Sequence, residues 1–123
     1  MSADAARSPE QLFDGHPDGL AICRRVQEVL SALGDVSVVV SKSQVSFRRR
    51  KAFAFVWRPG QYVSSGVPAV LSISLPREIG SDRFKEIAHP APTVWMHHLE
   101  LRDVSEVDDQ VRGWLVNAYE NAR

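Results

Sequence analysis

The middle of the chain consists of short segments rich in β-branched and aromatic residues, and this pattern restricts the fold more than any other feature of the sequence. Most of these segments alternate between apolar and polar residues. Successive side chains of a β-strand point to opposite faces, so each segment predicts a strand with one apolar face. The segments are VSVVVS at 36–41, QVSFRR at 44–49, AFAFVWR at 52–58, VLSISLP at 70–76 and TVWMHHLEL at 93–101.

Helical patterns flank the strand region on both sides. Ser8, Pro9 and Glu10 form a typical helix start, and Ser105 is a predicted N-cap for a closing helix over 103–123. The second and third predicted helices each carry a stripe of apolar residues with helical spacing. The stripes are Ile22, Cys23, Val26, Val29, Leu30 and Leu33 in the second helix, and Val107, Val111, Trp114 or Leu115, and Ala118 in the last.

This order of elements predicts an α+β fold, a two-layer sandwich of an antiparallel sheet of about five strands with helices packed on one face. The order is helix, helix, strands, helix. We expect residues 1–7 to form a flexible tail and residues 8–123 to form a single domain. Residues 80–92 read as a polar connection with one helical turn around 83–87.

The composition limits the possible partners and compartment. The 123 residues contain 15 Lys plus Arg and 15 Asp plus Glu, so the formal net charge is zero and no overall charge attracts nucleic acid. Cys23 is the only cysteine, which excludes an internal disulfide, and its helical position predicts a buried thiol. No segment resembles a signal peptide or a membrane span, which predicts a cytoplasmic protein without a membrane partner.

The last predicted strand contains two adjacent histidines that must point to opposite faces of the sheet. His97 shares its face with Trp95 and Leu99, which predicts a core histidine held by hydrogen bonds. His98 falls on the opposite, open face. If Phe53, Phe55 and Trp57 face the core, the open face collects small and polar side chains. It would then hold Ser46, Arg48, Ala54, Val56, Arg58, Ser72, Ser74 and His98.

Several short pieces of the chain, in this order and spacing, resemble the bacterial family known as domain of unknown function 5655. They are LFDGHPDGL, VSKSQVSFRRRKAFAFV, SDRFKEI, WMHHLEL and VDDQVRGWLVNAYENA, and the resemblance extends from about Leu12 to Tyr119. It implies the positions typical of members: Lys42, Phe47, Phe53, Ala54, Arg83, His98, Trp114, Leu115, Ala118 and Tyr119. A more distant similarity is to YjbR-type double-wing domains, for which nucleic-acid binding has been suggested. The family has no established activity, so the resemblance implies a fold and a set of residues and no reaction.

The candidate ligand site consists of Lys42, Arg48, Arg83 and His98, whose charges could converge on a phosphate or carboxylate. A second, weaker candidate is the basic hairpin of Arg49, Arg50 and Lys51, which could contact a nucleic-acid backbone. The alternative interpretations involve no ligand. The open face could be the solvent-exposed side of an antiparallel sheet, and the hairpin charges could be solvated residues at a turn. The sequence contains no motif for a metal, a cofactor or a nucleophilic catalytic site.

Three functions therefore remain open. The chain could be a small binding module for an anionic ligand, either a phosphate-bearing metabolite or nucleic acid. It could be an enzyme that uses His98 as a general acid or base. It could also be an interaction domain that forms a homodimer through the sheet face.

Overall fold

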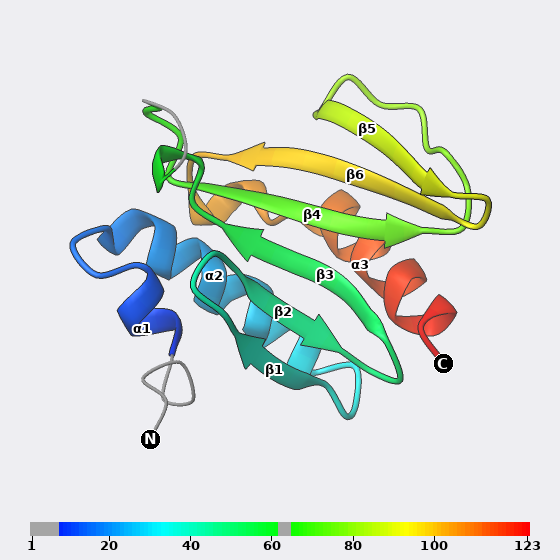
Figure 1. Ribbon diagram of the computed structural model, residues 1–123, viewed down its shortest axis with the longest axis horizontal. Coiled ribbons are helices and arrows are strands. Elements are labelled where there is room, and N and C mark those ends of the chain that lie inside the picture. The colour runs from blue at the N-terminus through cyan, green and yellow to red at the C-terminus, as the bar shows by residue number, and fades with distance from the viewer. Residues whose placement is uncertain (1–7, 62–64) are drawn as a thin grey trace.

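A computed structural model describes residues 8–61 and 65–123 of the protein (Figure 1). The predicted flexible tail, residues 1–7, lies outside the described residues. The helices are α1 (Pro9–Leu12), α2 (Pro17–Ser31) and α3 (Asp109–Asn121), with short 3₁₀ turns η2 (Pro59–Gln61) and η3 (Val104–Glu106). The strands are β1 (Ser37–Val40), β2 (Val45–Arg48), β3 (Ala52–Trp57), β4 (Ala69–Leu75), β5 (Phe84–Ala91) and β6 (Val94–Leu101).

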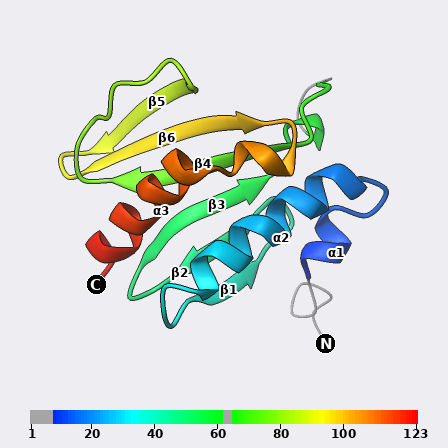
Figure 2. The same ribbon diagram turned by 180° about the vertical axis from the view of Figure 1, so that it is seen from behind.

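The strands form one antiparallel sheet in the order β1-β2-β3-β4-β6-β5. Helices α2 and α3 lie on the same face of this sheet (Figures 1 and 2). The other face carries no helix of the described chain, and we call it the open face. The predicted α+β sandwich with an antiparallel sheet is therefore confirmed.

The expected helical turn around residues 83–87 is wrong, because this segment forms the edge strand β5. Phe84 pairs with Leu99 of β6 and is buried. The β5–β6 pairing is irregular between Phe84 and Glu86 and again between Ala88 and Ala91. These irregularities break the period of two that identifies the other strands, and Pro90 adds a signal typical of a connection.

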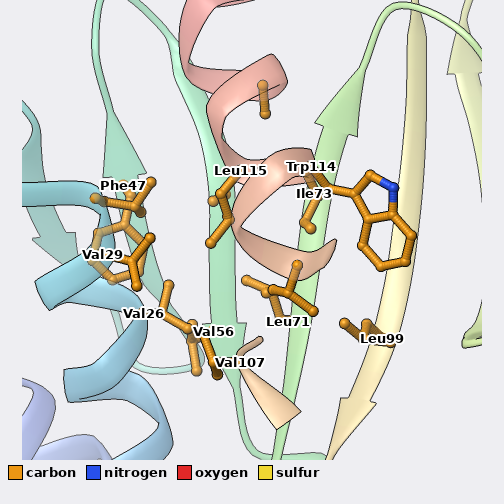
Figure 3. Close-up of a cluster of buried hydrophobic side chains, with 14 of the residues drawn as sticks. Val26, Val29, Phe47, Val56, Leu71, Ile73, Leu99, Val107, Trp114 and Leu115 are labelled. Carbon is orange, nitrogen blue, oxygen red and sulfur yellow. The ribbon is translucent and has the colours of Figure 1, made fainter. Parts of the chain in front are cut away.

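The core lies between the two helices and the covered face of the sheet (Figure 3). Helix α2 contributes the buried Ile22, Cys23 and Val26, and burial raises the pKa of the Cys23 thiol to about 12. Residues from α3 and from β4 complete the same cluster. They include Val111, Trp114, Leu115 and Ala118 from α3, and Leu71, Ile73 and Leu75 from β4. The predicted apolar stripes of both helices, and the predicted burial of Cys23, are confirmed.

The predicted phase of β3 is wrong for most of the strand. Ala54 and Val56, expected on the open face, are fully buried in the core, whereas Phe55 and Trp57 lie on the open face. The cause is a register shift next to Arg48, which pairs with Ala52 while Phe47 pairs with Ala54. A bulge of this kind places one extra residue in the strand and changes which side chains face the core.

Phe53 is the residue that the bulge leaves without a partner in β2. Its side chain is buried, as predicted, and its ring meets Tyr119 of α3 edge to face, with ring centroids 5.9 Å apart. Phe53 and Ala54 can therefore both be buried although they are adjacent.

Helix α3 begins later than the sequence suggests. Its N-cap is Asp108, whose side chain accepts a hydrogen bond from the Val111 N–H, so the predicted cap Ser105 is wrong. Ser105 instead lies in η3, where its N–H and hydroxyl donate to Asp103. The predicted cap of α1 is confirmed, since Ser8 accepts from the Gln11 N–H.

Candidate functional site

A row of paired residues crosses the open face from β2 to β5. Ser46 pairs with Phe55, Phe55 pairs with Ser72, and Ser72 pairs with His98. His98 in turn pairs with Glu86 on the edge strand β5. A pocket of about 600 Å³ lies over this row and is lined by Gln44, Phe55, Trp57, Ser72, Met96 and His98.

A chain of hydrogen bonds runs through the floor of the pocket from Trp57 to His98. The Trp57 Nε1–H donates to Ser72 Oγ over 2.9 Å, and Ser72 Oγ lies 2.7 Å from His98 Nδ1. Ser72 is 3 % exposed, so its hydroxyl hydrogen needs an acceptor. Trp57 can only donate, and Nδ1 is the one acceptor among the described residues that lies within reach of this hydroxyl. The arrangement that satisfies every group has Ser72 donating to Nδ1, with the His98 proton on Nε2.

The same arrangement keeps His98 uncharged. Burial lowers the pKa of His98 below its usual value, although Glu86 opposes the shift and the neighbouring His97 adds to it. Protonating Nδ1 would also deprive the Ser72 hydroxyl of its acceptor. Trp57 meets the His98 ring edge to face, with centroids 6.4 Å apart and planes at 86°. His98 therefore presents a neutral ring with Nε2–H as its remaining donor.

His97 has the opposite surroundings and the opposite tautomer. Its side chain is 0 % exposed on the covered face, as predicted. The Trp95 carbonyl lies 2.9 Å from Nδ1 and accepts its proton, while Nε2 accepts a hydrogen bond from the Ile79 N–H over 3.0 Å. Both ring nitrogens therefore form hydrogen bonds, and the imidazole links the connection between β4 and β5 to β6.

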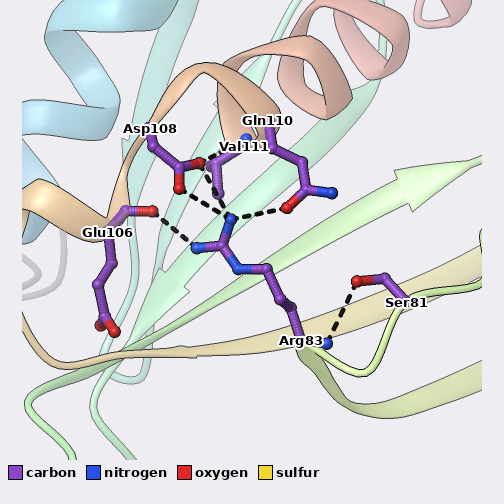
Figure 4. A network of polar contacts seen from close by, with 6 residues as sticks. All are labelled: Ser81, Arg83, Glu106, Asp108, Gln110 and Val111. Atoms are coloured by element: carbon purple, nitrogen blue, oxygen red, sulfur yellow. Dashed lines mark hydrogen bonds and ion pairs between the residues drawn. The ribbon is translucent and has the colours of Figure 1, made fainter.

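Arg83 lies apart from His98, on the side of the sheet that α3 covers (Figure 4). Its Nη1 donates to both carboxylate oxygens of Asp108 at 3.0 Å and to Gln110 Oε1 at 2.9 Å, and its Nη2 donates to the Glu106 carbonyl at 3.0 Å. The guanidinium also lies 5.8 Å from the centre of the Trp114 ring. Arg83 is thus engaged in holding the start of α3 to β5, and it does not converge with His98.

Asp108 shows how this contact affects the helix start. Partial desolvation raises the pKa of its carboxyl, but hydrogen bonds from the Val111 N–H and from Arg83, with the charge of Arg83, together hold the pKa below its usual value. The same carboxylate therefore caps α3 and binds the guanidinium.

The other two predicted cations, Lys42 and Arg48, lie on the β1–β2 side of the open face. Lys42 is exposed in the turn between β1 and β2, two residues before the pocket residue Gln44. Arg48 is exposed at the end of β2 and shares the face of Ser46. The structure therefore separates the predicted set, because Lys42 and Arg48 lie at opposite ends of β2, His98 lies on β6, and Arg83 lies on the covered side.

The basic hairpin is attached to the end of α3. The Arg49 guanidinium lies 4.1 Å from the centre of the Tyr119 ring and donates to the Tyr119 carbonyl over 3.2 Å. The Arg50 N–H donates to the Ala122 carbonyl over 3.0 Å. Cations are favoured at a helix C-terminus, so Arg49 has a structural role, while the side chains of Arg50 and Lys51 are exposed.

Of the six residues that line the pocket, only His98 belongs to the predicted ligand site. The signal available was the spacing of Phe55 and Trp57, which places both rings on one face of a strand. Assigning that face required the bulge beside Arg48. Among the described residues, no three His, Cys, Asp or Glu side chains lie together as a metal site would require.

The family comparison covers almost the whole of this fold. Residues 10–122 match the model of the domain of unknown function DUF5655. The chain belongs to this family. The match includes every strand of the sheet and both helices that cover it, so the pocket and the Arg83 contact both lie within the DUF5655 domain.

Further comparisons add no relative of known activity to the DUF5655 assignment. No curated protein and no solved structure shows significant similarity to the chain. In the described part of the DUF5655 chain, no helix is long and apolar enough to cross a membrane.

Proposed function

We propose that the protein is a binding module that holds a small, partly aromatic ligand in the pocket on the open face. The observation that carries this proposal is the hydrogen-bonded chain of Trp57, Ser72 and His98 in the floor of a mostly apolar pocket. Ligand sites typically combine apolar and aromatic walls with a few fixed polar groups. Here Phe55, Trp57 and Met96 supply the walls, and His98 supplies the polar group.

The position of the aromatic side chains favours a ligand site over a sheet face that is only exposed to solvent. Phe55 and Trp57 are only partly buried, although both are large and apolar. Partly exposed aromatic rings that flank a hydrogen-bond donor are suited to a planar ligand. An anionic substituent of such a ligand would be directed toward Lys42, which lies two residues before the pocket residue Gln44. Lys42 is the cation of the predicted site that this proposal keeps together with His98.

The test is a screen of small planar aromatic compounds that carry one polar group, with benzoate, benzamide and indole among them. Binding is followed by thermal shift and mapped by amide chemical shifts of the wild-type protein. We expect shifts at Phe55, Ser72 and His98, with affinity about tenfold weaker in His98→Ala and in Met96→Ala. The matched control is His16→Ala, which removes an exposed histidine outside the pocket. If none of the compounds binds, or if the shifts map elsewhere, the proposal is wrong.

General acid or base catalysis by His98 is a second candidate, favoured by one observation. The 2.7 Å contact between Ser72 Oγ and His98 Nδ1 is a hydrogen bond through which a hydroxyl could pass a proton to a neutral imidazole. Incubation of the protein with p-nitrophenyl acetate tests this function. A rate above background that is lost in both Ser72→Ala and His98→Ala would favour an enzyme. An equal rate in wild type and variants would exclude catalysis of ester hydrolysis by this pair.

Self-association through the open face is the third candidate function. A homodimer would bury the apolar wall of Phe55, Trp57 and Met96 against a second copy of the chain. Sedimentation of the wild-type protein over a concentration series distinguishes this arrangement from the ligand site. A monomer at all concentrations that still binds aromatic compounds supports the binding module.

A further inference from the structure

The donor at His98, the charges around it and the length of the open face together restrict the chemistry of the ligand. We propose that the pocket takes a nucleotide with a keto base, whose ring carbonyl accepts from His98 Nε2–H and whose phosphate lies toward Lys42. This inference rests on the proposed function, because it names the ligand class of the same pocket.

The first step concerns the group that His98 offers. Ser72 occupies Nδ1, which leaves Nε2–H as a donor. Among the described residues, Arg58 Nε is the only buried side-chain nitrogen or oxygen without a partner. Nε2 of His98 makes no hydrogen bond to a described residue, so it must be accessible. The ligand atom that meets His98 is therefore a hydrogen-bond acceptor and not a donor.

The second step concerns the charge of that acceptor. Glu86 lies directly opposite His98 on β5, whereas the carboxylate of Glu100, two residues along β6, is paired with Arg102. A neutral imidazole beside the Glu86 carboxylate does not attract an anion, and this carboxylate repels one. The acceptor at His98 is therefore an uncharged oxygen, such as the carbonyl of a ring or an amide.

The third step concerns the walls and the opposite side of the site. Phe55, Trp57 and Met96 offer apolar and aromatic surface on which a planar base can stack. Lys42 lies two residues before the pocket residue Gln44, just before β2, and β2 is separated from β6 by β3 and β4. Strands are about 4.8 Å apart, so β2 and β6 are roughly 14 Å apart, and the long Lys42 side chain shortens the distance to the pocket. A nucleotide carries an uncharged carbonyl at one end and a phosphate at the other.

The experiment measures binding of inosine 5′-monophosphate and adenosine 5′-monophosphate, which differ in a keto against an amino group on the base. We expect the wild-type protein to bind the inosine nucleotide about tenfold more tightly, since the amino group cannot accept from Nε2–H. In His98→Ala, the two nucleotides should bind equally. Lys42→Gln should weaken binding of both nucleotides and leave binding of inosine, which lacks the phosphate, unaffected. Lys51→Gln is the matched control, because this exposed cation lies on the hairpin between β2 and β3, at the other end of β2.

Equal binding of the two nucleotides by the wild-type protein would overturn the inference while leaving the binding module in place. Absence of binding by either nucleotide would also overturn it. In that case the aromatic compounds described above still decide whether the pocket binds ligands, so the two failures are distinguishable. A loss of binding in Lys51→Gln equal to that in Lys42→Gln would assign the phosphate to the basic hairpin and overturn the proposed orientation.

Discussion

The two faces of the sheet use adjacent histidines in opposite ways. On the covered face, His97 is fully buried and both of its nitrogens are bonded, one to the Trp95 carbonyl and one to the Ile79 N–H. On the open face, His98 bonds to Ser72 through Nδ1 and keeps Nε2–H accessible. The difference teaches that the residue type does not decide the role of an imidazole. The role follows from whether the surrounding chain satisfies every polar atom or leaves one for a partner.

The largest expected difference between the faces is between Phe47 and Phe55. Phe47 is fully buried under the helices, so Phe47→Ala should lower the free energy of unfolding by about 3–5 kcal/mol through lost burial and a cavity. Phe55 lies on the open face, where solvent fills the space that truncation leaves. Phe55→Ala should cost less than about 2 kcal/mol. Denaturant unfolding of both variants checks this pair, and equal losses would mean that β3 has the opposite phase.

The two histidine variants should differ less in their free energy of unfolding than the two phenylalanine variants do. His97→Ala leaves the Ile79 N–H and the Trp95 carbonyl without partners inside the core, so it should cost about 1–3 kcal/mol. His98→Ala should cost about 1 kcal/mol or less, because water can reach the freed Ser72 hydroxyl. Unfolding curves of the two variants at one pH give the comparison. A larger loss for His98→Ala would reverse the assignment of the faces.

A substitution of Arg83 tests whether this predicted ligand-site residue instead has a structural role on the covered side. Arg83→Met keeps the apolar stem and removes the hydrogen bonds to Asp108, Gln110 and the Glu106 carbonyl. It should lower the free energy of unfolding by about 1–2 kcal/mol and leave ligand binding at the pocket unchanged. Thermal unfolding and a titration with a compound that binds the wild-type protein measure the two effects. Lost binding with unchanged stability would return Arg83 to the ligand site.

The smallest effect is a pH dependence that belongs to the open face. The pKa of His98 is lowered in the folded state, so the unfolded chain takes up this proton first as the pH falls. The stabilising contribution is complete above the unfolded pKa of about 6.5 and is lost as the pH falls through that value toward the lower folded pKa. Wild type should therefore lose more stability than His98→Gln between about pH 7 and pH 5. Parallel curves for the two proteins would show that His98 is not desolvated.

Much of this architecture could be predicted from the sequence, because period-two and helical patterns report burial directly. The stripes of α2 and α3, the strand β4 and the burial of His97 follow from such patterns. The failures within the sheet have one physical cause, which is irregular pairing. The bulge at Phe53 exchanges the faces of Phe55 and Val56, and the irregular register of β5 hides a strand.

The candidate site was less predictable than the fold, because a site depends on distances between strands. The alternation of side chains along the strand placed His98 on the open face, but it could not show that Ser72 and Trp57 would be its partners. Arg83 entered the predicted set through its charge and through the family resemblance. Its actual partners, Asp108 and Gln110, begin a helix far along the chain, and only the fold brings them to it.

The most direct test of this account is the protonation of the two imidazole rings, measured by long-range ¹H–¹⁵N correlation spectra near neutral pH. The hydrogen bonds predict opposite tautomers in adjacent residues, with the proton on Nδ1 in His97 and on Nε2 in His98. In Ser72→Ala, the His98 ring should lose this preference while His97 keeps its own. A His98 ring protonated on Nδ1, or a His97 ring that exchanges between tautomers, would contradict the division between a closed face and a ligand-binding face.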